Sequence, residues 1–381
     1  MPESGGNKDL MRALKILHAA DMHMDSPFEG LSSGKAALRR TEQRALLDRL
    51  AALAKSESVD LVLLSGDLLD GSFAYRETLD ALKRFLGEVS VPVFIAPGNH
   101  DYYSAHSAYA QLDLPADTHI FTENRITAIT LPELDCTVYG AAFTDISSPA
   151  LLEGFSAPRE DGKYNLLCIH GEVGAAQSRY NAISEAQLAA SGIDYAALGH
   201  IHKASGLRKA GSTYYSWPGC PEGRGFDELG DRFVNIVTLD GAACSAKPVK
   251  LSLRNYEILR VDVSADDALA AVEKVLPVST ENDVYRIILT GETDAAPDMA
   301  RLTAALSPRF FELQLRDETH LRRDIWESAG SDTLRGIFLS KMREKFNSAK
   351  SDDARALVEQ AVKWGLAALD NTEEVVSHEN K

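Results

Sequence analysis

The feature that most constrains this 381-residue chain is an aliphatic run that ends in a single carboxylate. Val62, Leu63 and Leu64 form the run, Gly66 interrupts it, and Asp67 follows. A short apolar run bounded by glycine predicts a buried strand. Because open α/β sheets build their sites beyond the carboxyl ends of their strands, we expect Asp67 to lie in a functional site.

The same arrangement recurs at four other places. Residues 14–20, 91–96, 165–169 and 195–198 are also predicted strands, and polar residues follow each one. The side chains delivered in this way, together with Asp67, are Asp21, His23, Asn99, His170, His200 and His202. In extended chain, residues two apart face the same side, so Asp21 with His23, and His200 with His202, can each point at one ion.

Each of these residues has an ordinary explanation when it is taken alone. A lone His23 or His170 is more often structural than a ligand, Asn99 suits a turn after Gly98, and Asp21 could cap a loop. The whole set in this order is hard to obtain by chance. Seven oxygen and nitrogen donors suffice for two metal ions that share one carboxylate, and such a pair catalyses displacement at phosphorus. The mixed imidazole and carboxylate set favours manganese, iron or zinc over magnesium or calcium.

Alternation of strands and helices sets the predicted fold class. Helices expected at 36–55 and 75–86 separate the first strands, which predicts βαβ units and a mostly parallel sheet, an α/β fold. Beyond residue 250, strands at 257–263, 284–289 and 311–315 alternate with helices at 266–276 and 298–306, and two further helices are expected at 334–346 and 352–369. We therefore predict a main domain at 12–250, a small α/β domain at 251–322 and a helical segment at 323–381.

The charge composition limits the classes of partner that the chain can bind. The chain has 40 basic and 56 acidic residues, a net charge of −16, which would repel a polyanion at long range and disfavours a lysine-covered DNA binder. An enzyme that meets phosphates through metal ions and local basic patches stays possible. The candidate patches are Arg39–Arg40 with Arg44, the loop 203–209, and Arg322–Arg323. Each suits an ordinary solvated face equally well.

Location and redox state follow from what the sequence lacks. No apolar run approaches the ~18 residues that cross a bilayer, and residues 1–6 lack the layout of an export signal, so we expect a cytoplasmic protein without membrane contact. Residues 1–10 are polar and Gly-rich, and we expect the ordered chain to begin near Met11. The four cysteines are far apart, which predicts reduced thiols rather than disulfides or a thiolate zinc site.

Five short motifs carry a family resemblance. D-x-H, G-D, G-N-H-D, an isolated H and G-H-x-H occur in this order within about residues 14–240, and as a set they resemble the calcineurin-like metallophosphoesterase superfamily. The resemblance implies a β-sandwich flanked by helices. It also implies two divalent metal ions, the first held by Asp21, His23, Asp67 and His202 and the second by Asp67, Asn99, His170 and His200.

The resemblance gives His100 a separate role. In the G-N-H-D position, His100 would not bind metal, and it would stabilise the transition state or protonate the leaving oxygen. The alternative is that His100 only orients Asp101.

The branch of the superfamily is chosen from residues near the motifs. Ser/Thr phosphoprotein phosphatases carry an arginine soon after the second motif, and residues 70–73 contain none. Residues 66–70, 98–101 and the total length are more similar to the DNA repair exonuclease branch, the SbcD nuclease subunit and its YhaO-type relatives. Some members of that branch have a second histidine where this chain has Asp70. Residues 217–228 also resemble the YhaO-type relatives, and Arg224 there could serve a phosphate chain or lie in a plain surface loop.

This branch implies a manganese-dependent DNA exonuclease, with or without endonuclease activity, that acts on DNA ends. Residues 251–322 would be the capping domain, and the C-terminal helices would dock on the coiled coil of an SMC-like, SbcC-type ATPase. The resemblance leaves open a homodimer in which two copies pair through helices after the third motif, as in relatives. On the residues alone, the helix at 334–346 could simply pack on its own domain. Two rival functions stay open: a phosphodiesterase or phosphomonoesterase for a small nucleotide or other phosphoester, and a scaffold with an inert metal site.

Overall fold

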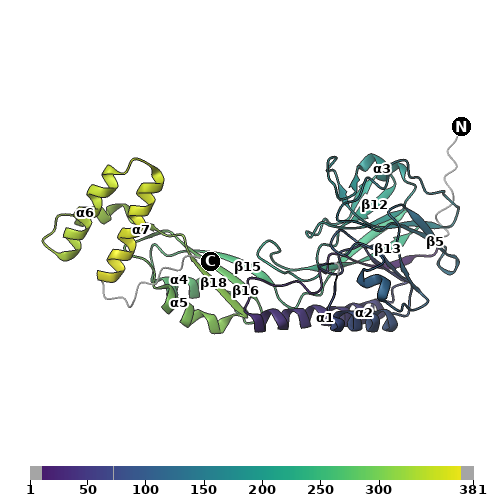
Figure 1. Cartoon of the computed structure of the whole chain (residues 1–381), viewed down its shortest axis with the longest axis horizontal. Coiled ribbons are helices and arrows are strands. Elements are labelled where there is room, and N and C mark those ends of the chain that lie inside the picture. Colours follow the sequence, from purple (N-terminus) through teal and green to yellow (C-terminus); the bar gives the residue numbers. More distant parts are fainter. Residues whose placement is uncertain (1–10, 72, 370–381) are drawn as a thin grey trace. The chain divides into compact units, whose positions relative to one another are not determined.

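The computed structural model of the chain describes residues 11–71 and 73–369 (Figure 1). The chain divides into two compact units between Asn255 and Tyr256. Our expectations for residues 1–10 and for the end of the chain beyond Leu369 lie outside the described residues. The predicted boundaries at 250 and 322 stay predictions.

One six-stranded sheet of the first unit carries the N-terminal motifs. Its strand order is β14-β13-β1-β2-β3-β4. The strands are β1 (Leu14–Ala19), β2 (Leu61–Leu64), β3 (Val93–Ile95), β4 (Thr118–Ile120), β13 (Phe233–Asp240) and β14 (Ala243–Lys250). Strands β1 to β4 pair in parallel, whereas β13 is antiparallel to both β1 and β14.

A second six-stranded sheet carries the later motifs, in the order β11-β12-β10-β7-β6-β5. Its strands are β5 (Thr127–Leu131), β6 (Cys136–Gly140), β7 (Tyr164–His170), β10 (Tyr195–Gly199), β11 (Arg208–Ala210) and β12 (Thr213–Ser216), and β8 (Glu172–Val173) pairs separately with β9 (Ala182–Ile183). The four inner strands are parallel and the two edge strands are antiparallel. The predicted parallel pairing thus holds inside each sheet, and antiparallel strands complete both.

The two sheets form a sandwich with helices outside. Alternate residues of a strand face opposite sides, so Ile16 packs with Leu166 of the other sheet, whereas Leu64 packs with Phe85 of a helix. Leu188 covers the outer face of the second sheet. The helices are α1 (Ser33–Ser56), α2 (Arg76–Glu88) and α3 (Glu185–Ala190), with short 3₁₀ turns η2 (Ala108–Gln111) and η3 (Pro132–Leu134). This α/β sandwich flanked by helices confirms the expected fold class.

The second unit has a smaller parallel sheet and a helical part. Strands β15 (Tyr256–Asp262), β16 (Val284–Thr290) and β18 (Glu312–Asp317) form the sheet, and helices α4 (Ala268–Val275) and α5 (Met299–Leu306) pack on it. The other elements are β17 (Glu292–Thr293), β19 (His320–Leu321), η4 (Ser307–Arg309), η5 (Arg323–Ser328), α6 (Leu334–Ser348) and α7 (Asp352–Leu369). Leu339 of α6 and Leu366 of α7 meet in a separate small core.

Two expectations about membranes and thiols can be compared with the described residues. None of the described helices combines the length and the apolar character that crossing a bilayer requires. All four cysteines are free, and Cys136, Cys168 and Cys220 are buried. Burial raises the pKa of the Cys136 and Cys168 thiols to about 12, so both stay protonated near neutral pH.

Candidate metal centre

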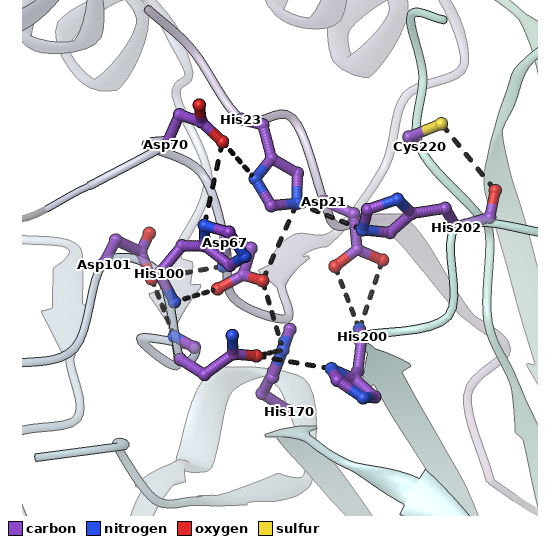
Figure 2. A network of polar contacts seen from close by, with 12 residues as sticks. Asp21, His23, Asp67, Asp70, His100, Asp101, His170, His200, His202 and Cys220 are labelled. Carbon is purple, nitrogen blue, oxygen red and sulfur yellow. Dashed lines mark hydrogen bonds and ion pairs between the residues drawn. The ribbon is translucent and has the colours of Figure 1, made fainter. Parts of the chain in front are cut away.

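Six of the seven predicted donors lie together where strands of both sheets end (Figure 2), and Asn99 Oδ1 lies 3.0 Å from His170 Nε2. Asp21 and His23 follow β1, Asp67 follows β2 and Asn99 follows β3. The second sheet contributes His170 at the end of β7, and His200 and His202 just after β10. The carboxyl ends of the parallel strands of both sheets therefore meet at one site, as the strand-then-polar pattern predicts.

The backbone at this site is held in unusual conformations. Asp21, His23, Asp67 and His200 have positive φ angles of 53°, 43°, 51° and 99°. Such angles are uncommon outside glycine, and each costs about 1–3 kcal/mol unless surrounding contacts impose it. Here the Asp21 N–H donates to Gly66 O at 3.0 Å and the His23 N–H donates to Asp67 O at 2.9 Å. Neighbouring loops therefore hold the strained residues in place.

Two motif glycines are required by close approach. A side chain at Gly98 would overlap the Asp67 carboxylate, and one at Gly199 would overlap the Ser65 carbonyl and approach the His170 ring. The glycines of G-N-H-D and G-H-x-H therefore let the two sheets bring their ligands together.

One half of the cluster places two imidazole lone pairs against each other. His23 Nδ1 lies 2.9 Å from Asp70 Oδ1 and His202 Nδ1 lies 2.8 Å from Glu228 Oε1, so each Nδ1 donates its proton to a carboxylate. The Nε2 atoms, 3.1 Å apart, then face each other with lone pairs. Asp67 Oδ2 lies 3.7 Å from His23 Nε2. A cation between these atoms would relieve their repulsion, and imidazoles whose second nitrogen donates to a carboxylate are typical metal ligands.

The other half of the cluster brings an imidazole, an amide oxygen and the Asp67 carboxylate together. His170 Nδ1 donates to Ser65 O at 2.9 Å, and its Nε2 lies 3.0 Å from Asn99 Oδ1 and 3.4 Å from Asp67 Oδ2. Asn99 Oδ1 is also 3.3 Å from His200 Nδ1. The Asp67 carboxylate therefore lies between the two halves, as a ligand shared by two cations would.

Burial and mutual attraction set the ionisation of this cluster. Burial raises the pKa of Asp21 to about 6 and lowers the pKa of His23 and of His200 to about 4. Burial would also lower the pKa of His170, but the adjacent Asp67 raises it to about 9, and the pKa of Asp67 lies well below its usual range. A cation that binds here would take the place of the His170 proton.

Three overlapping groups of side chains have ligand atoms close enough to share an ion. They are Asp21 with His23 and His202, Asp21 with Asp67 and His170, and His23 with Asp67 and His100. The donor types and the spacing fit divalent cations. The individual ligand roles stay predictions.

His100 lies at the rim of the cluster. Its backbone N–H donates to Asp67 Oδ1 at 2.9 Å, its ring packs on His23 with the ring centres 4.6 Å apart, and its Nδ1 is 3.7 Å from Asp70 Oδ1. The side chain is 45% exposed. The buried carboxylate of Asp101 accepts instead from the backbone N–H groups of Gly98 and Leu68 and from Tyr109. Within residues 11–71 and 73–369, His100 makes no contact that would orient Asp101.

Sequence reasoning did not predict the role of three residues that lie behind the ligands. Asp70 and Glu228 bond the Nδ1 atoms of His23 and His202, and Arg224 contacts both carboxylates. The sequence signal that could have indicated this role is the spacing of Arg224 and Glu228 in the glycine-rich segment 217–228. The expectation that Arg39 belongs to an exposed basic patch with Arg40 and Arg44 is wrong, because Arg39 is fully buried and pairs with Glu42 and Glu222.

The family is shown by comparison. The family model described as calcineurin-like phosphoesterase matches residues 14–204. The chain belongs to this family. The expected calcineurin-like family is therefore confirmed.

Individual relatives add detail. The uncharacterized metallophosphoesterase YhaO of Bacillus subtilis (strain 168) is 29% identical over 283 residues, which cover 69% of this chain and 66% of that protein, just under two thirds of its length. Two solved structures are similar over 62% of the chain. They are TT1561 of Thermus thermophilus, with a TM-score of 0.38, 13% identity and 99% of that chain covered, and a dimetal phosphatase from Danio rerio, with a TM-score of 0.39, 15% identity and 98% covered.

Proposed function

We propose that this phosphoesterase is a manganese-dependent DNA exonuclease that hydrolyses phosphodiester bonds at DNA ends with two divalent cations. The observation that carries the hydrolytic part of the proposal is the seven-donor cluster with the half-exposed His100 at its rim. Iron or zinc would suit the same donors.

The donor set divides into two overlapping ligand groups. Asp21, His23, Asp67 and His202 would hold one cation, and Asp67, Asn99, His170 and His200 the other. Once bound, the pair of cations would polarise a phosphoryl group and supply a hydroxide at neutral pH. The shared position of Asp67 rests on its distances of 3.7 Å to His23 Nε2 and 3.4 Å to His170 Nε2.

The chain's own contribution to the reaction would come from His100. Its ring packs on His23, and its exposed edge is open to a substrate. A protonated imidazole there can donate a hydrogen bond to the charged oxygens of the transition state and a proton to the leaving oxygen.

A positively charged side chain beside the cluster, that of Arg179, supports a substrate with more than one phosphate. The Tyr180 ring packs on His200 with their centres 4.8 Å apart. Arg179 stacks on that ring at 5.0 Å, and its Nη2 donates to the Tyr180 hydroxyl at 2.8 Å. Arg179 is exposed, and no carboxylate of the described residues lies within ion-pair distance of its guanidinium. It is thus available to a neighbouring phosphate of a nucleic acid chain.

The second unit is the reason for preferring DNA over a small ester. Its sheet and helices exceed what hydrolysis of a small phosphoester requires, and we propose that they serve as a capping domain and as a docking segment. The exposed Leu334 and Ile337 of α6 and Leu357 of α7 would meet the coiled coil of an SMC-like, SbcC-type ATPase. A homodimer of the chain is a further proposal.

The alternative substrate is a small nucleotide or another phosphoester. The net charge of −16 favours it, because long-range repulsion slows the approach of a polyanion more than that of a small ester. Both proposals use the same cluster and the same His100.

One experiment separates these functions. We expect end-labelled single- or double-stranded DNA to be degraded with Mn²⁺ and not with EDTA. His100→Ala should lower the rate about 10²–10⁴-fold while Mn²⁺ binding persists, and the matched variant His106→Ala, an exposed histidine, should be neutral. Hydrolysis of bis-p-nitrophenyl phosphate without DNA degradation would favour the small-ester function. If neither DNA nor bis-p-nitrophenyl phosphate is hydrolysed, the inert scaffold is favoured.

A further inference from the structure

Three charged side chains lie behind the imidazoles of His23 and His202. Asp70 Oδ1 is 2.9 Å from His23 Nδ1, and Glu228 Oε1 is 2.8 Å from His202 Nδ1. Arg224 joins the two carboxylates, since its Nη1 lies 3.3 Å from Asp70 Oδ1 and its Nη2 lies 2.8 Å from Glu228 Oε1. One guanidinium therefore fixes the partners of both imidazoles.

Further bonds tie Arg224 to Glu228. Its Nε and its backbone N–H also donate to Glu228 Oε2, at 3.4 Å and 2.8 Å, and its side chain is only 19% exposed. The sequence left open a role for Arg224 in binding a phosphate chain. The bonds to Glu228 and Asp70 leave the guanidinium fork turned toward carboxylates of the protein instead.

The segment that carries Arg224 is anchored to helix α1. Glu222 is fully buried, and its two carboxylate oxygens pair with Arg39 at 3.0 Å and with Arg49 at 2.8 Å. Glu222 also accepts the Leu253 N–H at 3.0 Å. These bonds fix the chain at Glu222, two residues before Arg224. The guanidinium is therefore held in place without a substrate.

The other half of the cluster lacks such partners. His170 Nδ1 donates to the Ser65 carbonyl, and His200 Nδ1 lies beside the Asn99 amide oxygen. His200 therefore faces the cluster with Nδ1, and its outer nitrogen is Nε2. Among the described residues, no carboxylate bonds His170 Nδ1 or His200 Nε2. A carboxylate makes an imidazole a stronger ligand than a neutral carbonyl does, because it stabilises the positive charge that a bound cation draws onto the ring.

We propose that Arg224, Glu228 and Asp70 are positioning residues that make the His23–His202 half of the centre bind its divalent cation more tightly than the His170–His200 half. Arg224 offsets the repulsion between Asp70 and Glu228, so both carboxylates can stay ionised behind the ligands. The two cations are then taken up in a fixed order. The inference rests on the metal centre and not on the choice of DNA as substrate.

The test is a titration of the metal-free full chain with Mn²⁺, in which electron paramagnetic resonance measures the free ion. We expect two bound ions of unequal affinity. His202→Ala should remove the tighter class, and Asn99→Ala should weaken only the other class. Glu228→Gln keeps the shape of the side chain and removes its charge, so it should weaken the tighter class about 10–100-fold and leave the other unchanged.

Controls make the result specific to the network. Asp227→Asn is the matched control, because Asp227 is exposed in the same segment and the same chemical change is made. Arg224→Lys keeps the charge but not the fork, and it should weaken the tighter class by a smaller factor. It also serves if Glu228→Gln does not fold.

Three results would overturn the proposal: equal affinity of the two ions in the unaltered chain, equal weakening of both classes in Glu228→Gln, or no change in that variant. Each can arise whether or not the chain degrades DNA, so failure of the nuclease proposal would be seen separately.

Discussion

Buried charge is arranged differently in the two units of the chain. In the first unit, Asp21, His23, Asp67 and His170 are all essentially without solvent exposure, and their acceptor atoms point at one another. In the second unit, Lys363 is 8% exposed. Its ammonium donates to Asp317 Oδ2 at 2.7 Å, Thr319 O at 2.9 Å and Thr319 Oγ1 at 2.7 Å.

The difference separates a structural network from a functional one. Lys363 has three protons and three acceptors, so its bonds are complete without any further group. The cluster in the first unit places the Nε2 atoms of His23 and His202 3.1 Å apart, an arrangement that a bound cation would complete. Changes to the seven-donor cluster should therefore alter activity, and changes at Lys363 should alter stability.

The largest expected effect is that of Asp67→Asn. The amide oxygen can still accept the His100 N–H that now bonds Asp67 Oδ1 at 2.9 Å, but the charge shared between the two halves is lost. Hydrolysis of bis-p-nitrophenyl phosphate with Mn²⁺ should fall at least about 1,000-fold, or about 4 kcal/mol of activation free energy. Thermal unfolding in EDTA should shift downward, because the low pKa of Asp67 means that its charge stabilises the folded chain, and the amide leaves His170 without its charged partner. If the activity stays within ten-fold of that of the unaltered chain, the cluster in the first unit is not the functional network of this comparison.

The next effect is on the stability of the second unit. Lys363→Met leaves Asp317 and Thr319 without their shared donor and should lower the free energy of unfolding of this unit by about 2–4 kcal/mol. Hydrogen exchange followed by mass spectrometry should show faster exchange in β18 and α7, and the exchange rates of the first unit should not change. Lys350→Met, at an exposed lysine, is the control. An equal loss of protection in both units would contradict a network confined to the second.

The seven donors could be predicted because their signal is local. Asp67, for example, directly follows a buried strand, and Gly98 and Gly199 mark where the chains approach. Contacts between distant segments could not be predicted. Glu228 meets His202 across 26 residues, and Arg39 meets Glu222 across 183, so periodicity shows neither. Strand β13 is apolar, yet its antiparallel place beside β1 depends on a pairing that spans most of the first unit.

A third effect tests buried charge in the first unit away from the cluster. His18 lies inside the sandwich with Nδ1 2.8 Å from the Tyr195 hydroxyl, and burial lowers its pKa to about 3. The unfolded chain, with a histidine pKa near 6.5, binds more protons than the folded chain below that pH. Stability should therefore fall as the pH drops from about 6.5 toward 3, by about 2 kcal/mol between pH 7 and pH 5.

The His18 effect can be measured in the first unit alone. Urea unfolding with EDTA is followed by the fluorescence of Trp217 after Trp326→Phe and Trp364→Phe, which leave it as the only tryptophan of the three in the chain. His18→Gln should remove this part of the pH dependence, while the other histidines titrate equally in both proteins. The same acid sensitivity in both would show that His18 stays neutral in the unfolded chain or protonates in the folded one.

The smallest effect should come from the exposed apolar residues of the second unit. Ile337 of α6 is 50% exposed and Leu357 of α7 is 68% exposed, so Ile337→Ser and Leu357→Ser should each change the free energy of unfolding by less than about 0.5 kcal/mol. Leu366→Ala, in the core that joins the same helices, should by contrast cost about 2–5 kcal/mol. If the two helices bind the coiled coil of an SMC-like ATPase, the serine variants should lose that binding while keeping their stability. Binding that survives both substitutions would mean that these apolar side chains do not form the contact.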